Sequence, residues 1–156
     1  IIFYKKIKQY IDYFILFYII YQMNYLTSYK SNKNIIYSCK YHIIWCTKFR
    51  RDLLKEQVDI DLKNIILEVS KKLKVEVIEI EIMPDHVHLL VDVDPQFGVH
   101  KYIKNVKGAS SKLLRDKYKE LRSRVPTLWT NSYFISTVGG VTLDVVKKYI
   151  EEQKNV

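Results

Sequence analysis

The most constraining feature of this sequence is a pair of alternating segments separated by a very short turn. In residues 86–93, four valine and leucine side chains occupy every other position, which is the two-residue period of a strand with one buried face. Residues 75–82 alternate in a similar way, and Met83-Pro84-Asp85 lies between the two segments. Because proline lacks the amide hydrogen that a central strand needs, the pattern predicts a tight antiparallel hairpin.

The segments on either side predict the other elements of an α+β fold. Residues 35–47 are rich in β-branched and aromatic side chains, which favours a strand. Residues 53–73 and 99–118 carry apolar side chains at three- and four-residue steps, which is typical of amphipathic helices. Residues 126–138 predict a last strand, and residues 142–153 predict a final helix. This order is that of a ferredoxin-like, RRM-like antiparallel sheet with helices on one face and an appended C-terminal helix.

The first residues differ in composition from the rest of the chain. Ile, Tyr, Lys and Phe make up most of residues 1–22, and the first methionine is Met23. The apolar stretch is too short for a membrane span of about 20 residues, so we expect no membrane association. We interpret residues 1–22 as an upstream extension or apolar leader, with a signal-like or amphipathic membrane-surface helix as the alternative. Residues 23–156 would then form a single domain, which we expect in the cytoplasm.

Positive charge is concentrated in one part of the chain. The formal net charge is +9, and residues 98–124 carry nine lysines and arginines against two acids. This concentration favours a polyanionic partner such as nucleic acid. Trp129, Tyr133 and Phe134 are candidates for stacking on unpaired bases, with core packing as the alternative. An ordinary solvated lysine-rich face is the alternative for each candidate phosphate contact, and these candidates are Lys48, Arg50, Arg51, Lys104, Lys107, Lys112 and Arg115.

Two histidines form the first chemically distinctive motif. His86 and His88 are two residues apart on a predicted strand, so both side chains project from the same face. Two neighbouring imidazoles can hold one metal ion, and a pair of solvated or core-edge histidines is the alternative. Because the other face of this strand is fully apolar, we expect the histidines on the uncovered side of the sheet. We interpret His42 and His100 as structural.

A second pair of polar residues lies on the predicted final helix. Tyr149 and Gln153 are four residues apart, so they stack on one helical face. The alternative is that Tyr149 is a boundary residue and Gln153 the solvated end of an amphipathic helix.

Together these motifs resemble those of a known family, the small single-tyrosine HUH transposases of the insertion-sequence 200/605 group. The resemblance extends over about residues 35–153, and residues 1–22 have no counterpart in it. The motifs that carry it are Met83-Pro84-Asp85 followed by His86-Val87-His88, residues 128–134, Gly139-Gly140, and residues 147–153.

The resemblance implies a metal-dependent transposase that cleaves and rejoins single-stranded DNA at hairpin-bearing element ends. Tyr149 would be the nucleophile that forms a 5′-phosphotyrosine, and Gly139 and Gly140 would form a hinge before its helix. The resemblance also implies a homodimer whose active sites can be composed in trans. The ligands of a divalent ion, Mg²⁺ or Mn²⁺, would be His86, His88 and Gln153.

Two other functions remain open from the sequence. The first is a non-catalytic RRM-like module that binds nucleic acid through the basic helix and the strand aromatics. The second is a domesticated relative of the transposases that acts on repeated palindromes in a chromosome.

Overall fold

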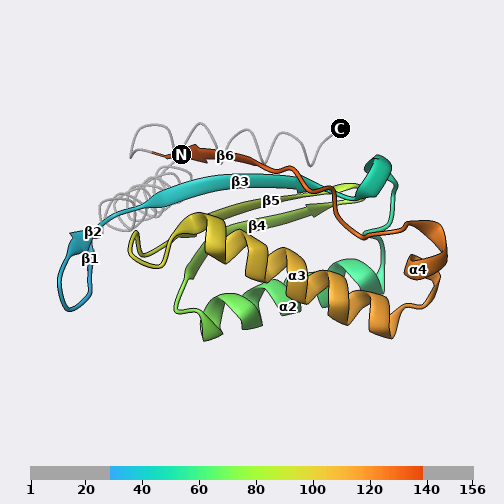
Figure 1. Cartoon of the computed structure of the whole chain (residues 1–156), viewed down its shortest axis with the longest axis horizontal. Helices are drawn as coiled ribbons and strands as arrows, with labels where there is room; N and C mark the ends of the chain where they lie inside the picture. Colours follow the sequence, from blue (N-terminus) through green and yellow to red (C-terminus); the bar gives the residue numbers. More distant parts are fainter. Residues whose placement is uncertain (1–28, 139–156) are drawn as a thin grey trace, which may run out of the picture.

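The computed structural model describes residues 29–138, which form a four-stranded antiparallel sheet with helices over one face (Figure 1). The sheet has the order β4-β5-β3-β6, so the first and third strands along the chain lie in the middle. This is the ferredoxin-like arrangement, and the predicted α+β class is confirmed. The strands are β3 (Lys40–Cys46), β4 (Glu76–Met83), β5 (His86–Asp92) and β6 (Phe134–Thr137).

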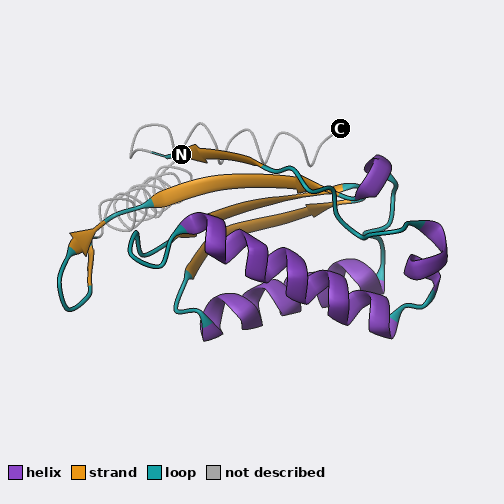
Figure 2. Ribbon diagram, viewed as in Figure 1, coloured by secondary structure: helices purple, strands orange, loops and turns teal. Residues whose placement is uncertain are grey.

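Two helices form the second layer, on the same side of the sheet (Figure 2). They are α2 (Gln57–Lys72) and α3 (Val99–Lys117), and they pack against each other and the sheet. Helix α3 agrees with its predicted bounds, but α2 begins later than the predicted residue 53. The reason is that the amides of Leu53 and Leu54 both donate to the carbonyl of Pro84, at 2.9 Å, and so tie this segment to the hairpin turn.

The core lies between the sheet and the two helices. On β5, Val87, Leu89 and Val91 all point into it and are buried, as their alternation predicts. Burial of such side chains contributes about 1.5–3 kcal/mol each. The residues that meet them from β3, α2 and α3 include Ile43, Trp45, Leu62, Ile66, Tyr102, Ile103, Val106 and Leu114.

The first predicted strand is divided into two pieces. Residues 36–37 form β2 (Ile36–Tyr37), which pairs only with β1 (Lys30–Ser31) in a small separate ladder. Between β2 and β3, the amide of Cys39 donates to a carboxylate oxygen of Asp92 at 3.1 Å. A side chain therefore takes the place of a strand partner at this point, and the prediction of one continuous strand over residues 35–47 is wrong.

The last predicted strand is much shorter than expected. Within the predicted segment 126–138, only β6 forms a ladder with β3. The residues before β6 pair with the sheet through one isolated bridge, between Thr47 and Trp129. The side-chain amine of Lys107 donates hydrogen bonds to the backbone carbonyls of residues 130–132. These carbonyls therefore do not pair with a neighbouring strand. A short helix, α4 (Glu120–Arg124), precedes this segment, and no pattern in the sequence predicts it.

Several predictions concern residues outside the described range. These are the leader at residues 1–22, the Gly139-Gly140 hinge, and the final helix with Tyr149 and Gln153. Within residues 29–138, no helix is both long and apolar enough to cross a membrane.

Candidate functional site

The two motif histidines lie side by side at the start of β5. The Nε2 atoms of His86 and His88 are 3.1 Å apart, and the ring centroids are separated by 4.9 Å. The residues lie on one face because they are two positions apart on a strand paired on both sides. The structure therefore confirms that the two imidazoles share a face and brings their outer nitrogens together.

A carboxylate in the hairpin turn holds His86 from its other side. Asp85 makes a hydrogen bond with Nδ1 of His86 and an ion pair with Arg50, 2.9 Å from Nη2. Burial opposes ionisation of Asp85, but its hydrogen bond with His86 and the positive charges of His86 and Arg50 outweigh burial and lower the pKa of the carboxyl. Asp85 thus stays ionised and orients the His86 ring.

The turn that supplies Arg50 is fixed to the hairpin through Thr47. The Thr47 amide donates to the Asp85 carbonyl at 2.8 Å, and its hydroxyl lies 3.1 Å from the same oxygen and 2.7 Å from the carbonyl of Arg51. Phe49 and Arg50 adopt left-handed backbone conformations, with φ of 59° and 50°. The left-handed conformation is sterically unfavourable for residues with bulky side chains, so the contacts of the turn must stabilise it.

A third histidine, His42 on β3, completes a row with the first two. Its Nε2 lies 3.2 Å from Nδ1 of His88, and the two rings are nearly parallel. The pairing register places His42 opposite Leu90, so that His88 is its diagonal neighbour on the same face. The sequence predicts a structural role for His42 and not this contact, because sequence alone does not give the register between two strands 40 residues apart.

The histidine face is not open at its centre, which corrects the sequence prediction. His88 is 3% exposed, and Leu90 and Asp92 farther along the same row are also buried. One described cause is a second apolar cluster on this face, in which Leu90 packs with Val138 and Ile78. His42 and His88 therefore lie in a covered region of the sheet, whereas His86 is partly exposed.

Burial keeps the inner histidines neutral. Burial, with the charges of His86 and His42 adding to it, lowers the pKa of His88 to about 4. Burial also lowers the pKa of His42. A neutral imidazole has a free lone pair, which is the form that binds a metal ion.

The geometry of the pair fits a divalent ion. Two imidazole nitrogens that bind one ion at about 2.1 Å, with a right angle between them, stand about 3 Å apart, which is close to the Nε2 separation of 3.1 Å. The carboxylate on His86 is the kind of outer partner that orients a ligating histidine. Among residues 29–138, no cluster of three or more His, Cys, Asp or Glu side chains has a metal-binding arrangement.

Two of the seven basic candidates on the surface are structural anchors. Lys107 donates to three successive carbonyls in residues 130–132, at 2.8 to 3.3 Å, and burial lowers its pKa. Arg115 donates to the carbonyls of residues 125–126 at 3.3 and 2.9 Å. Both side chains fasten the segment before β6 to α3, which the sequence did not show.

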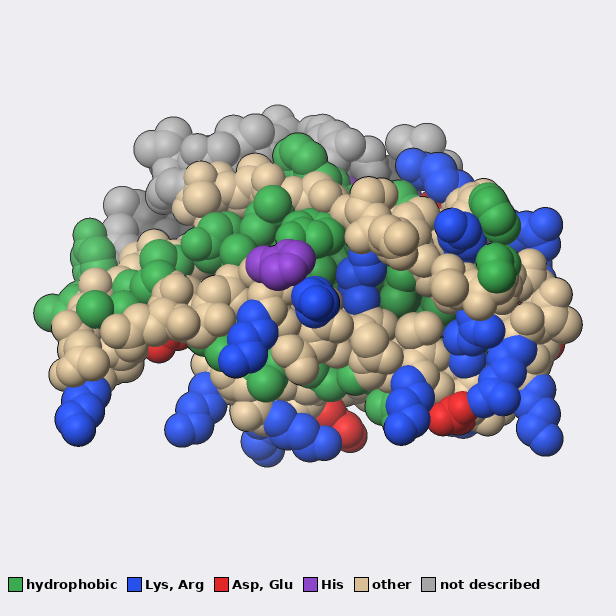
Figure 3. Space-filling model, viewed as in Figure 1, with side chains coloured by type: hydrophobic (Ala, Val, Ile, Leu, Met, Phe, Trp, Pro, Cys, Tyr) green, Lys and Arg blue, Asp and Glu red, His purple; other side chains and the backbone are tan. Residues whose placement is uncertain are grey.

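The other five candidates lie on two surfaces. Lys104 and Lys112 are exposed on α3, and Figure 3 shows lysine and arginine side chains gathered over the helical layer. Arg51 is exposed near the hairpin turn, and it donates to a backbone carbonyl of α4 at 2.9 Å. Lys48 lies over the ring of the exposed Phe49, and Arg50 is the partner of Asp85 described above.

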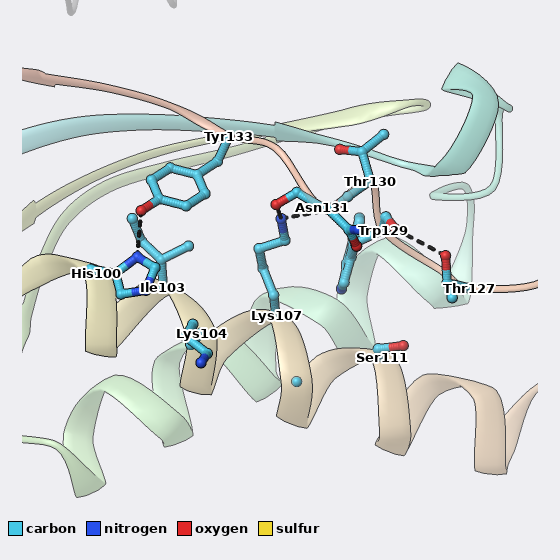
Figure 4. Close-up of a pocket in the computed structure, with 11 residues that line it drawn as sticks. His100, Ile103, Lys104, Lys107, Ser111, Thr127, Trp129, Thr130, Asn131 and Tyr133 are labelled. Atoms are coloured by element: carbon cyan, nitrogen blue, oxygen red, sulfur yellow. Dashed lines mark hydrogen bonds between the residues drawn. The ribbon is translucent and has the colours of Figure 1, made fainter.

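A groove of about 440 Å³ lies between α3 and the segment before β6 (Figure 4). Tyr133 lines it and accepts or donates one hydrogen bond with Nδ1 of His100, at 2.7 Å. Trp129, a stacking candidate, is only 5% exposed and packs edge-on against Trp45, so it belongs to the core. Phe134 is 56% exposed.

Comparisons with known proteins cover most of the chain. A family model described as "Transposase IS200 like" matches residues 35–153. The chain is 38% identical over 126 residues to the ISDra2 transposase TnpA of Deinococcus radiodurans, covering 80% of this chain and 90% of that protein. It is 28% identical over 130 residues to the transposase for insertion sequence element IS200 of Salmonella typhimurium, covering 80% and 86%. A solved transposase structure from Deinococcus radiodurans is similar with a TM-score of 0.67 and 33% identity, covering 80% of this chain and 97% of the other.

The low pKa of His88 predicts a pH-dependent stability without metal. The pKa is about 4 in the folded chain and about 6.5 in the unfolded chain, so the unfolded chain binds more protons between these values. The free energy of unfolding should therefore fall as the pH drops from about 7 to 4, by up to about 3 kcal/mol from this group. Urea denaturation in EDTA measures the profile.

The variant His88→Gln should flatten that part of the profile, because it removes the titrating group. His100→Gln, at an exposed histidine, is the matched control and should keep the wild-type slope. Parallel profiles for wild type and His88→Gln would contradict the assignment of the pH dependence to His88.

Proposed function

This chain belongs to the IS200-like transposase family, and from that premise we propose that it cleaves and rejoins single-stranded DNA at the hairpin-bearing ends of an insertion sequence. The observation that carries the proposal is the pair formed by His86 and His88, whose Nε2 atoms lie 3.1 Å apart within the matched segment. Two imidazoles so arranged can supply two ligands of a divalent metal site.

We infer that His86 and His88, together with Gln153, hold a divalent ion, Mg²⁺ or Mn²⁺. Two imidazoles and an amide oxygen suit Mn²⁺ better than Mg²⁺ as donors, and phosphate and water oxygens would complete either shell. When bound, the ion would stabilise the charge that develops on the phosphate and on the departing 3′ oxygen. The protein's own part is to present two imidazole nitrogens at a fixed separation.

Asp85 and Arg50 support this arrangement from outside the pair. The ionised Asp85 accepts a hydrogen bond from Nδ1–H of His86, which leaves the Nε2 lone pair for the ion. Arg50 holds the Asp85 carboxylate at 2.9 Å and neutralises its charge. Together they fix the ring orientation and the tautomer of His86.

Tyr149 is proposed as the nucleophile. Its phenolic oxygen forms a bond to the phosphorus of a DNA phosphodiester, and the bond to the 3′ oxygen breaks. The phenol proton leaves with the attack, and the departing strand ends in a 3′-OH. The 5′-phosphotyrosine conserves the energy of the broken bond, so the 3′-OH of another strand can reverse the step without ATP.

The proposal includes a homodimer that acts in the cytoplasm. A single tyrosine gives one covalent DNA link per protomer, so two protomers are required to hold two cut ends. The Gly139-Gly140 joint supports an arrangement in trans, because glycine accepts the backbone angles that a hinge needs.

The first test asks whether Tyr149 forms a covalent DNA adduct. A single-stranded oligonucleotide carrying the hairpin from DNA that flanks the gene is incubated with protein and Mn²⁺ or Mg²⁺. Denaturing electrophoresis should show an adduct with wild type, and Tyr149→Phe should reduce it at least about 100-fold because the nucleophilic oxygen is gone. Tyr118→Phe, at the distal end of α3, is the tyrosine control and should retain the adduct.

Replacing both His86 and His88 with alanine should abolish cleavage while most of the hairpin binding remains, because the basic surface on α3 does not include the pair. An undiminished adduct in Tyr149→Phe would overturn the proposed nucleophile. DNA binding that needs no metal and gives no adduct in wild type would favour the non-catalytic binding module.

The second test separates DNA contacts from structural anchors. Lys104→Ala with Lys112→Ala removes two exposed charges from α3, so hairpin affinity should fall and the salt slope should decrease by between about one and two. Stability should stay within about 0.5 kcal/mol of wild type. Arg115→Ala should instead lower the free energy of unfolding by about 1 kcal/mol, since it leaves two carbonyls without their donor.

Fluorescence anisotropy at several salt concentrations measures the affinities. The matched control is Lys71→Ala with Lys72→Ala, which removes the same charge from the exposed end of α2. An unchanged salt slope for the α3 variant, equal to that of the α2 control, would remove Lys104 and Lys112 from the DNA-binding surface.

A further inference from the structure

A row of three imidazoles extends from the hairpin turn across β5 to β3. His86 meets His88 through their Nε2 atoms at 3.1 Å, and His88 meets His42 from Nδ1 to Nε2 at 3.2 Å. Both His88 and His42 are buried, at 3% and 5% exposure. Asp85 closes the row on the His86 side. Each ring nitrogen that joins this row therefore has a defined neighbour.

The proton positions follow from the acceptor at one end. An ionised carboxylate only accepts, so Asp85 requires the proton of neutral His86 to lie on Nδ1 and leaves Nε2 bare. The neighbour of His88 at its Nδ1 is Nε2 of His42, at 3.2 Å. The direction of the hydrogen bond between His88 and His42 thus decides which nitrogen of His88 is bare.

We propose that His42 is a positioning residue for the metal site: it accepts a hydrogen bond from Nδ1–H of His88, so that the proton of His88 lies on Nδ1 and the lone pair of its Nε2 is directed at the ion. This inference rests on the proposed function only in taking His86 and His88 as metal ligands. His42 itself does not touch the ion, because its Nε2 faces the opposite nitrogen of His88.

An imidazole suits this position because it can reverse the direction of its hydrogen bond. In one arrangement, Nε2–H of His88 donates a hydrogen bond to Nε2 of His86, and Nδ1 of His88 then accepts a hydrogen bond from Nε2–H of His42. When both Nε2 atoms are bare, Nδ1 of His88 donates and His42 carries its own proton on Nδ1. Each of the three rings keeps one proton in both arrangements, so the row exchanges one for the other without a net gain or loss of charge.

The surroundings of His42 favour this role over simple packing. Its ring lies nearly parallel to that of His88, with centroids 5.4 Å apart and an angle of 11°. Phe134 on β6 packs edge-on against His42, with the two ring centroids 6.5 Å apart. A buried ring nitrogen without a hydrogen-bond partner raises the free energy of the folded chain. This penalty favours the hydrogen bond between His42 and His88.

Metal affinity tests the hydrogen bond in the full-length protein. Isothermal titration with Mn²⁺ should show that His42→Leu weakens binding about 10- to 100-fold, because His88 loses its acceptor. His42→Gln should recover most of that loss, since its amide can accept or donate at the same place. Wild-type affinity in His42→Leu, or equal weakening in both variants, would overturn the proposal.

Tautomers measured by nitrogen NMR provide a readout that does not depend on any variant folding. With Zn²⁺ as a diamagnetic probe at pH 8, the proton of His88 in wild type should lie on Nδ1 and that of His42 also on Nδ1. A proton on Nε2 of His88 in the zinc-bound protein would overturn the proposal.

These measurements use no DNA, so they are separable from the proposed function. Absence of a covalent adduct in wild type would remove the transposase mechanism while the affinities and tautomers still decide the role of His42. An adduct in wild type, combined with unchanged metal affinity in His42→Leu, would remove the role of His42 alone.

Discussion

The antiparallel pairing of β3 with β5 is the constraint on which the rest of the described structure depends. On one face, this register aligns Ile43 and Trp45 with the valines and leucine of β5, and helices α2 and α3 close the core over them. On the other face, the same register places His42 diagonally beside His88. A shift of one residue would send every side chain of a strand to the opposite face, so the core and the histidine row require the same pairing.

The short turn at Pro84 and Asp85 is the second constraint, because it positions the charged groups that orient His86. Pro84 accepts two amides from the segment before α2, and Thr47 bonds the Asp85 carbonyl, so the turn is tied to both neighbours. This places an ionised carboxylate against His86 and an arginine against the carboxylate. The result is one imidazole oriented by charge and one, His88, kept neutral by burial. Such a pair can present two lone pairs to one ion.

Much of the fold follows from local sequence patterns. The alternation in residues 86–93, the turn at Pro84 and the helical periodicity of α3 all predict elements that the structure contains, because each depends on neighbours within a few residues. The predictions were wrong where a distant side chain decides the backbone's partner. The Asp92 carboxylate accepts from the Cys39 amide, and the Lys107 amine donates to the carbonyls of residues 130–132. A local sequence pattern predicts neither hydrogen bond.

In the candidate site too, features set by near neighbours in the sequence could be predicted, and features set by distant residues could not. His86 and His88 are two residues apart, so their shared face could be predicted, whereas His42 belongs to the row only through strand pairing. Arg115 and Lys107 looked like surface charges in the sequence, but their partners are backbone carbonyls that fold back onto α3. The exposed lysines of α3 are the positions where sequence and structure agree on a solvated cation.

The central claim is that Tyr149 makes the covalent link to DNA beside a metal held by His86 and His88. Mass spectrometry of the nuclease-trimmed, trypsin-digested adduct identifies the linked residue directly. We expect a nucleotide phosphate on the peptide that begins at Tyr149, which trypsin releases by cutting after Lys148. A nucleotide attached to any other tyrosine, or to a serine, would contradict it.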